Sequence, residues 1–98
     1  VTYKYGTMII GGDFNSKCRK LLLRAGEMAG FEPGIALKVD ELNKDLKFDR
    51  NEMKSYLEYL SDRELIHLKS IGGPLLYGHI ELTKSGVKKA EDLRKKNN

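Results

Sequence analysis

The sequence contains a single cysteine, Cys18, and its longest apolar runs are only three or four residues. One cysteine cannot close a disulfide within the chain or supply a cysteine-based zinc finger, and it fits a reducing compartment. Runs this short fall far below the roughly 20 apolar residues that a membrane-spanning helix needs. No basic-then-apolar leader opens the sequence. We therefore expect a cytoplasmic protein with no membrane segment.

The common catalytic motifs are also missing. The sequence has no G-x-S-x-G, H-E-x-x-H or phosphate-loop pattern. Cys18 falls on an apolar helical stripe with Leu21 and Leu22, which favours a core position over a nucleophile. We therefore expect no enzymatic activity, no cofactor and no bound metal.

The charge of the chain is positive but unevenly distributed. The 98 residues are enough for one domain with a modest core, and 33% charged residues are typical of a soluble fold. The net charge of +4 favours an acidic partner such as nucleic acid. Residues 1–30 carry +3 and residues 65–98 carry +4, whereas residues 31–48 carry −1 and residues 49–64 carry −2. The basic charge is thus concentrated at the two ends of the sequence.

The first twelve residues, VTYKYGTMIIGG, are expected to form an extended arm or an additional strand. Their tyrosines and β-prone Met8, Ile9 and Ile10 precede Gly11-Gly12, which we expect to break the run. Because this strand would lack a partner in its own chain, it is expected to dock or dimerise. The domain proper is then expected over residues 13–98.

Apolar spacing predicts two helices and a short strand in the first half of this domain. The first helix begins near Asp13 and ends at Gly30, with Phe31 folding back onto its last turn. A strand over residues 35–38 follows, and Asp40 is expected to cap a second helix. The stripe of the first helix comprises Cys18, Leu21, Leu22, Ala25 and Met28.

Two further helices flank a predicted β-hairpin. Asp49 and Glu52 have the spacing of a capping box at the start of the third helix. Thr83 is expected to cap the fourth helix. The predicted buried stripes are Met53, Tyr56, Leu57 and Leu60 in the third helix, and Val87, Ala90 and Leu93 in the fourth.

The hairpin between them is expected to turn at Gly72-Gly73-Pro74. This centre separates large apolar residues onto one face and His, Lys and Tyr onto the other, and a one-residue slip would destroy the separation. A facing histidine pair could share a metal ion, although two ligands make a poor site. The expected pairs are Ile66 with Ile80, His67 with His79, Leu68 with Gly78, and Lys69 with Tyr77.

The order helix, strand, helix, helix, strand, strand, helix resembles the winged helix-turn-helix domains of bacterial and archaeal transcription regulators. Residues 51–66, NEMKSYLEYLSDRELI, are similar to a recognition helix running into the first wing strand. Residues 80–93, IELTKSGVKKAEDL, are similar to the strand-Leu-Thr-x-x-Gly-helix exit of that family. The resemblance implies an α+β, mainly α fold with a three-helix core, a β-hairpin wing and a C-terminal helix.

The resemblance also implies that a helix over residues 49–62 reads duplex DNA in the major groove. Arginine can read guanine and asparagine can read adenine through paired hydrogen bonds, while wing residues meet phosphates. Partners implied in this way are duplex DNA and a second copy of the chain, through the N-terminal strand or the C-terminal helix. The expected DNA contacts are Arg50, Asn51, Lys54 and Ser55 in the helix, and Lys69 and Tyr77 in the wing.

The alternative is a protein-interaction winged-helix module in a larger complex. The third helix carries net negative charge, and a solvated helix needs polar residues in any case. The hairpin tip, residues 71–76, is apolar, and an exposed apolar patch usually marks a protein contact. Its leucines could instead fold back onto the core. The basic residues of the first and fourth helices could likewise meet phosphate or simply face solvent.

Overall fold

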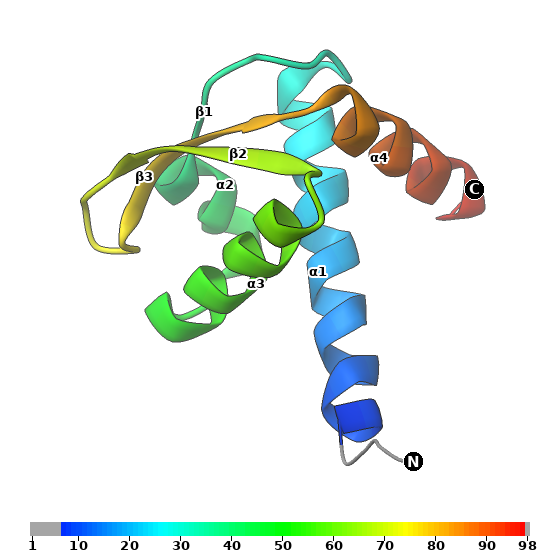
Figure 1. Ribbon diagram of the computed structural model, residues 1–98, viewed down its shortest axis with the longest axis horizontal. Helices are drawn as coiled ribbons and strands as arrows, with labels where there is room; N and C mark the ends of the chain where they lie inside the picture. Colours follow the sequence, from blue (N-terminus) through cyan, green and yellow to red (C-terminus); the bar gives the residue numbers. More distant parts are fainter. Residues whose placement is uncertain (1–6, 98) are drawn as a thin grey trace.

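The computed structural model describes the backbone of residues 7–97 and the side chains of residues 16–96. Within that range the elements occur in the predicted order, so the expectation of a mainly helical α+β domain is confirmed (Figure 1). The elements are α1 (Thr7–Ala29), β1 (Leu37–Lys38), α2 (Val39–Leu46), α3 (Arg50–Asp62), β2 (Ile66–Ile71), β3 (Tyr77–Leu82) and α4 (Lys84–Asn97).

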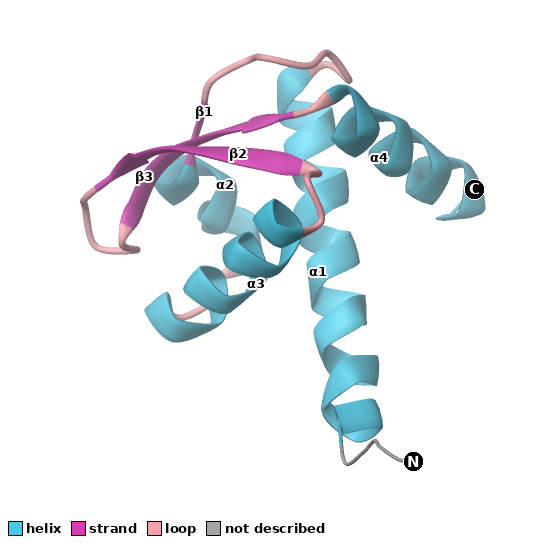
Figure 2. Cartoon of the chain, viewed as in Figure 1, coloured by secondary structure: helices cyan, strands magenta, loops and turns pink. Residues whose placement is uncertain are grey.

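The three strands form one antiparallel sheet in the order β1-β3-β2. β2 and β3 make the hairpin, and β1 adds to its other edge by pairing Leu37 with Ile80. Figure 2 shows the sheet as a layer beside α2 and α3, with α1 running past both. The short β1 therefore ties the segment between α1 and α2 to the hairpin.

A single core joins all of these elements. The predicted stripes of α1, α3 and α4 are buried as expected, with Met28 only partly so. Leu21, Leu42 and Met53 are completely inaccessible to solvent. Since α4 packs against α1, its apolar side is covered within the chain and is not left for a second copy.

The expectation of an extended arm is wrong from Thr7 onward. α1 begins at Thr7 and continues through Gly11 and Gly12, so a strand-mediated dimer has no strand to use over residues 7–12. Glycine inside a helix costs about 1 kcal/mol relative to alanine. A helix satisfies its own backbone hydrogen bonds, whereas a lone strand leaves a row of them unpaired. The first half of the expected arm, residues 1–6, lies outside the described residues.

The expected hairpin register is also wrong, by two residues. Ile66 pairs with Leu82 and Leu68 pairs with Ile80, and a bulge follows Leu68. The connection is longer than expected, since residues 72–76 separate the two strands, and Gly72, Gly73 and Leu76 adopt positive φ values within it. A two-residue shift keeps Ile66, Leu68, Ile80 and Leu82 on one face, so alternation could not distinguish the two registers.

The new register separates the two histidines. His67 pairs with Glu81, and His79 pairs with Ser70. The Nδ1 atom of His79 lies 3.1 Å from the Ser70 hydroxyl oxygen. The facing histidine pair that could have shared a metal ion is therefore not formed.

The start of α2 differs from the prediction by two residues. β1 covers only Leu37–Lys38, and Lys38 occupies the N-cap position in place of Asp40. The helix therefore begins at Val39, whose side chain is fully buried in the first turn. The Asp40 carboxylate accepts a hydrogen bond from the Glu41 amide, 2.8 Å away, within that turn.

The two corners at the base of the hairpin are bonded to each other. The Thr83 hydroxyl donates to the Glu64 carbonyl at 2.8 Å and accepts from the Gly86 amide at 2.9 Å, which confirms Thr83 as the cap of α4. The Thr83 amide donates to the Leu65 carbonyl at 3.1 Å. A Cβ atom on Gly86 would overlap the Leu65 carbonyl oxygen. The Leu-Thr-x-x-Gly sequence thus allows α4 to leave β3 against the end of α3.

Candidate nucleic-acid interface

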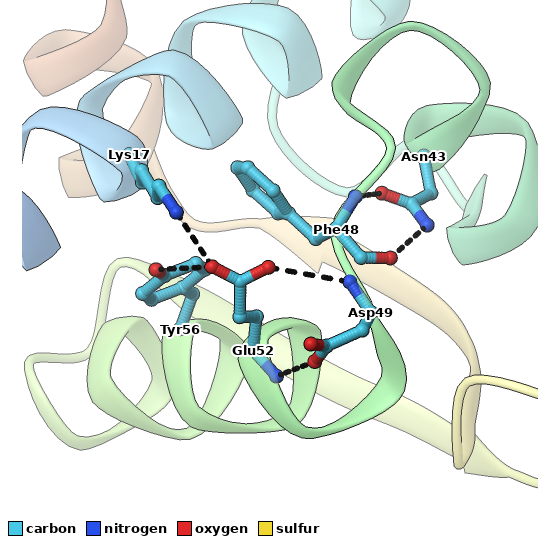
Figure 3. A network of polar contacts seen from close by, with 6 residues as sticks. All are labelled: Lys17, Asn43, Phe48, Asp49, Glu52 and Tyr56. Carbon is cyan, nitrogen blue, oxygen red and sulfur yellow. Dashed lines mark hydrogen bonds and ion pairs between the residues drawn. The ribbon is translucent and has the colours of Figure 1, made fainter.

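The start of α3 is fixed by side chains on both sides of Phe48 (Figure 3). The Asn43 side-chain amide donates to the Phe48 carbonyl and accepts from the Phe48 amide, both at 2.8 Å. The predicted capping box is present: Asp49 accepts from the Glu52 amide at 2.8 Å, and Glu52 accepts from the Asp49 amide at 3.3 Å. These bonds hold the first turn of α3 in one orientation.

Glu52 also connects α3 to α1. Its Oε2 atom lies 2.7 Å from the Lys17 ammonium nitrogen and accepts a 3.3 Å hydrogen bond from the Tyr56 hydroxyl (Figure 3). Two hydrogen bonds lower the pKa of the Glu52 carboxyl. The bond from Lys17 has the larger effect, and the bond from the Asp49 amide has the smaller one. Glu52 is therefore an anion with a cation beside it at neutral pH.

The outward side of the N-terminal half of α3 carries four of the six predicted contact residues. Arg50, Asn51, Lys54 and Ser55 are all exposed. Residues four apart on a helix lie on the same face, so Arg50 stands over Lys54, and Asn51 over Ser55. The structure thus brings these four side chains together as two neighbouring rows.

The two predicted hairpin contacts have different surroundings. The Tyr77 hydroxyl donates a 2.7 Å hydrogen bond to the Glu58 carboxylate of α3, and this bond raises the pKa of Tyr77. Tyr77 is also partly buried against the core, although the expected register placed it on the solvent side. Lys69 is exposed, and its ammonium nitrogen lies 4.0 Å from a carboxylate oxygen of Glu81. Tyr77 therefore joins the hairpin to α3, whereas Lys69 remains on the hairpin surface.

The carboxylates of α3 are arranged more favourably for an anionic partner than the sequence indicates. Glu52 is paired with Lys17, and Glu58 receives the Tyr77 hydroxyl. Sequence patterns miss both contacts because the partners are 35 and 19 residues away in the chain. The exposed Asp62 lies at the far end of the helix from Arg50. The exposed N-terminal half of α3 is accordingly more basic than the net charge of −2 over residues 49–64 indicates.

The hairpin tip, residues 71–76, is expected from its sequence either to be exposed as an apolar patch or to fold its leucines onto the core, and it does each in part. Leu75 packs partly buried against the core, as one alternative expects. Ile71 is 80% exposed, which leaves an apolar side chain in solvent. The tip is therefore neither folded back completely nor exposed completely.

No protein-family model, curated protein or solved structure matches the chain. Among the described residues, no helix combines the length and apolar character needed to cross a membrane. The same residues contain no group of three or more potential metal ligands.

Proposed function

We propose that the protein is a winged-helix DNA-binding protein that acts in transcription regulation and places α3 in the major groove of duplex DNA. One observation carries the proposal. Arg50, Asn51, Lys54 and Ser55 are exposed together on the first turns of α3, while Lys17 holds the carboxylate of Glu52 against α1. In such domains the start of this helix contacts base edges, and arginine and asparagine are suited to reading guanine and adenine.

The remaining acidic residues of α3 do not prevent this mode of binding. A helix rises about 1.5 Å per residue, so Glu58 lies about 12 Å and Asp62 about 18 Å from Arg50 along the axis. Exposed charges farther apart than the Debye length, about 8 Å at physiological ionic strength, are largely screened. A phosphate near Arg50 is therefore largely screened from Glu58 and Asp62, and the nearer carboxylate of Asp49 is engaged by the Glu52 amide.

The wing contributes in two ways under this proposal. Lys69 is exposed on β2 and supplies a phosphate contact. Tyr77 is a positioning residue, because its bond to Glu58 fixes the hairpin relative to α3. Phosphate contacts of this kind set the register of a protein on the duplex rather than its sequence preference.

The test is a titration with mixed-sequence duplex DNA at several salt concentrations, with fluorescence anisotropy as the readout. We expect binding that weakens steeply with salt. Lys54→Gln should lower the affinity and reduce the slope of log K against log salt by about 0.9, the value for one lost phosphate contact. Lys88→Gln removes the same charge from an exposed position on α4 and should leave the slope unchanged. Absence of binding at low salt, or equal slopes for both variants, would refute the proposal.

A protein-interaction module is the second candidate, favoured by the exposure of Ile71 at the wing tip. An apolar side chain that is exposed at a tip can anchor a protein partner. In a pull-down from host extract, this candidate requires a protein that binds the wild type and is lost with Ile71→Thr. Recovery of nucleic acid alone, unaffected by Ile71→Thr, would reject it.

A further inference from the structure

A cavity of about 260 Å³ opens where α1, the end of α3 and α4 meet. It lies at the end of α3 opposite to Arg50, and Figure 1 shows the three helices converging there. It is therefore separate from the surface proposed to contact DNA. Its lining comprises Cys18, Arg19, Leu22, Tyr59, Leu60, Arg63, Leu65, Lys89 and Leu93.

The inner part of this cavity is apolar. Leu22, Leu60 and Leu93 are buried residues of the core, and Leu65 is half-buried. Burial raises the pKa of the Cys18 thiol to about 12, and the charge of Arg63 opposes this only in part. Cys18 is therefore a neutral thiol at physiological pH and adds to the apolar wall.

The rim of the cavity is cationic. Arg19 from α1, Arg63 from the end of α3 and Lys89 from α4 line it, and none of its lining residues is Asp or Glu. The Arg63 guanidinium lies 4.4 Å from the centroid of the Tyr59 ring. Stacking on an aromatic ring leaves the guanidinium hydrogens in its plane available to an anion.

Other cations of α1 have a different environment. Arg24 lies 2.9 Å from the Asp45 carboxylate, and Lys17 lies 2.7 Å from that of Glu52. No ion pair among the described residues involves Arg19, Arg63 or Lys89. The cations of α1 that meet α2 and α3 thus have carboxylate partners, whereas the three around the cavity converge without one.

We propose that this cavity binds a compact organic anion: a carboxylate with an aromatic or medium-chain aliphatic body. The leucines and Tyr59 would take the apolar body, and the three cations would take the carboxylate. Ligand sites commonly combine an apolar lining with a few convergent polar groups, and a cavity of about 260 Å³, just below the usual range of about 300–1,000 Å³, suits only a small ligand. A phosphate group alone would leave the apolar wall unused. The proposal stands independently of DNA binding.

The first experiment is isothermal titration calorimetry of the full chain with 2-naphthoate and octanoate. The neutral analogue 2-naphthamide serves as the ligand control. We expect saturable binding of at least one carboxylate. The amide should bind at least about tenfold more weakly than the acid, since a hydrogen bond to a charged group contributes about 1.5–3 kcal/mol. Failure of both carboxylates to bind, or equal affinity for acid and amide, would overturn the proposal.

Protein variants test the position of the site. Lys89→Gln and Arg63→Gln should each weaken 2-naphthoate about tenfold by the same loss of a charged partner. Lys88→Gln, which neutralises the exposed neighbour of Lys89 outside the cavity, should bind like the wild type. Lys89 is itself exposed, so Lys89→Gln gives a valid test even if Arg63→Gln impairs folding. Equal binding by Lys89→Gln and the wild type would contradict the assignment.

Chemical-shift mapping by NMR locates the ligand directly. Adding 2-naphthoate should shift the amide resonances of Cys18, Tyr59, Leu65 and Leu93. Shifts confined to the hairpin tip would place the ligand elsewhere and reject the cavity. Inorganic phosphate is titrated in parallel: if it binds as tightly as 2-naphthoate and shifts the same amides, the apolar part of the proposal is wrong.

Discussion

The base and the tip of the hairpin belong to the same two strands but are held in very different ways. At the base, Ile66 and Leu82 face each other and are each only 1% exposed. Thr83 bonds this end to the corner after α3. At the tip, Ile71 is 80% exposed and the connection turns through residues of positive φ. The hairpin is thus held most firmly at its base, while the tip end is held by the Tyr77–Glu58 bond and the partly buried Leu75, and Ile71 stays in solvent.

The difference follows from the number of independent constraints at each end. Burying a large aliphatic side chain contributes about 1.5–3 kcal/mol, and each satisfied hydrogen bond adds about 0.5–1.5 kcal/mol. Both kinds of interaction coincide at the base. At the tip, Leu75 provides partial burial, and the Gly72 amide donates a hydrogen bond to the Leu76 carbonyl across the turn. Substitutions should therefore cost much more at the base.

The largest expected effect is that of Gly86→Ala. The new Cβ atom would overlap the carbonyl oxygen of Leu65, and a backbone atom cannot move aside as a flexible side chain can. We expect a loss of about 3 kcal/mol in the free energy of unfolding, at the upper end of overpacking costs. Urea denaturation monitored by circular dichroism measures this free energy of unfolding. Ser85→Ala, at the exposed preceding position, is the control, and equal stabilities for the two variants would show that the corner is not tightly packed.

Thr83→Ala should have the next largest effect. The substitution removes the cap of α4 and the bond to the Glu64 carbonyl, so we expect a loss of about 1–2 kcal/mol. Thr83→Ser keeps the hydroxyl and should retain most of the stability. The same urea titration compares the two variants. If the serine variant were as unstable as the alanine variant, the hydroxyl bonds would not be what joins the corners.

The helices and their caps could largely be predicted from sequence because their signals are local. Asp49 and Glu52 are three residues apart, as are Thr83 and Gly86, and both caps form as expected. The buried stripes of α3 and α4 follow from helical spacing alone. Four of the predicted contact residues, all within one helical face, are exposed together for the same reason.

The parts that sequence could not predict depend on distant partners or on equivalent alternatives. The pairing of Ile66 with Leu82 or with Ile80 gives the same apolar face, and only the longer turn and the bulge decide between them. The contact of Lys17 with Glu52 joins residues in different helices. The cavity between α1, α3 and α4 combines side chains that no local pattern connects.

The smallest expected effect is that of Ile71→Thr at the tip. Threonine keeps the β-branched shape that suits a strand, and Ile71 has little buried surface to lose, so stability should change by less than about 0.5 kcal/mol. Ile66→Thr makes the same substitution at the buried end of the same strand. It should cost about 2 kcal/mol or more, because it removes buried apolar atoms and buries a hydroxyl. Similar losses for the two variants in urea denaturation would mean that the tip is packed in solution, and Ile71 would then lose its place as a candidate protein contact.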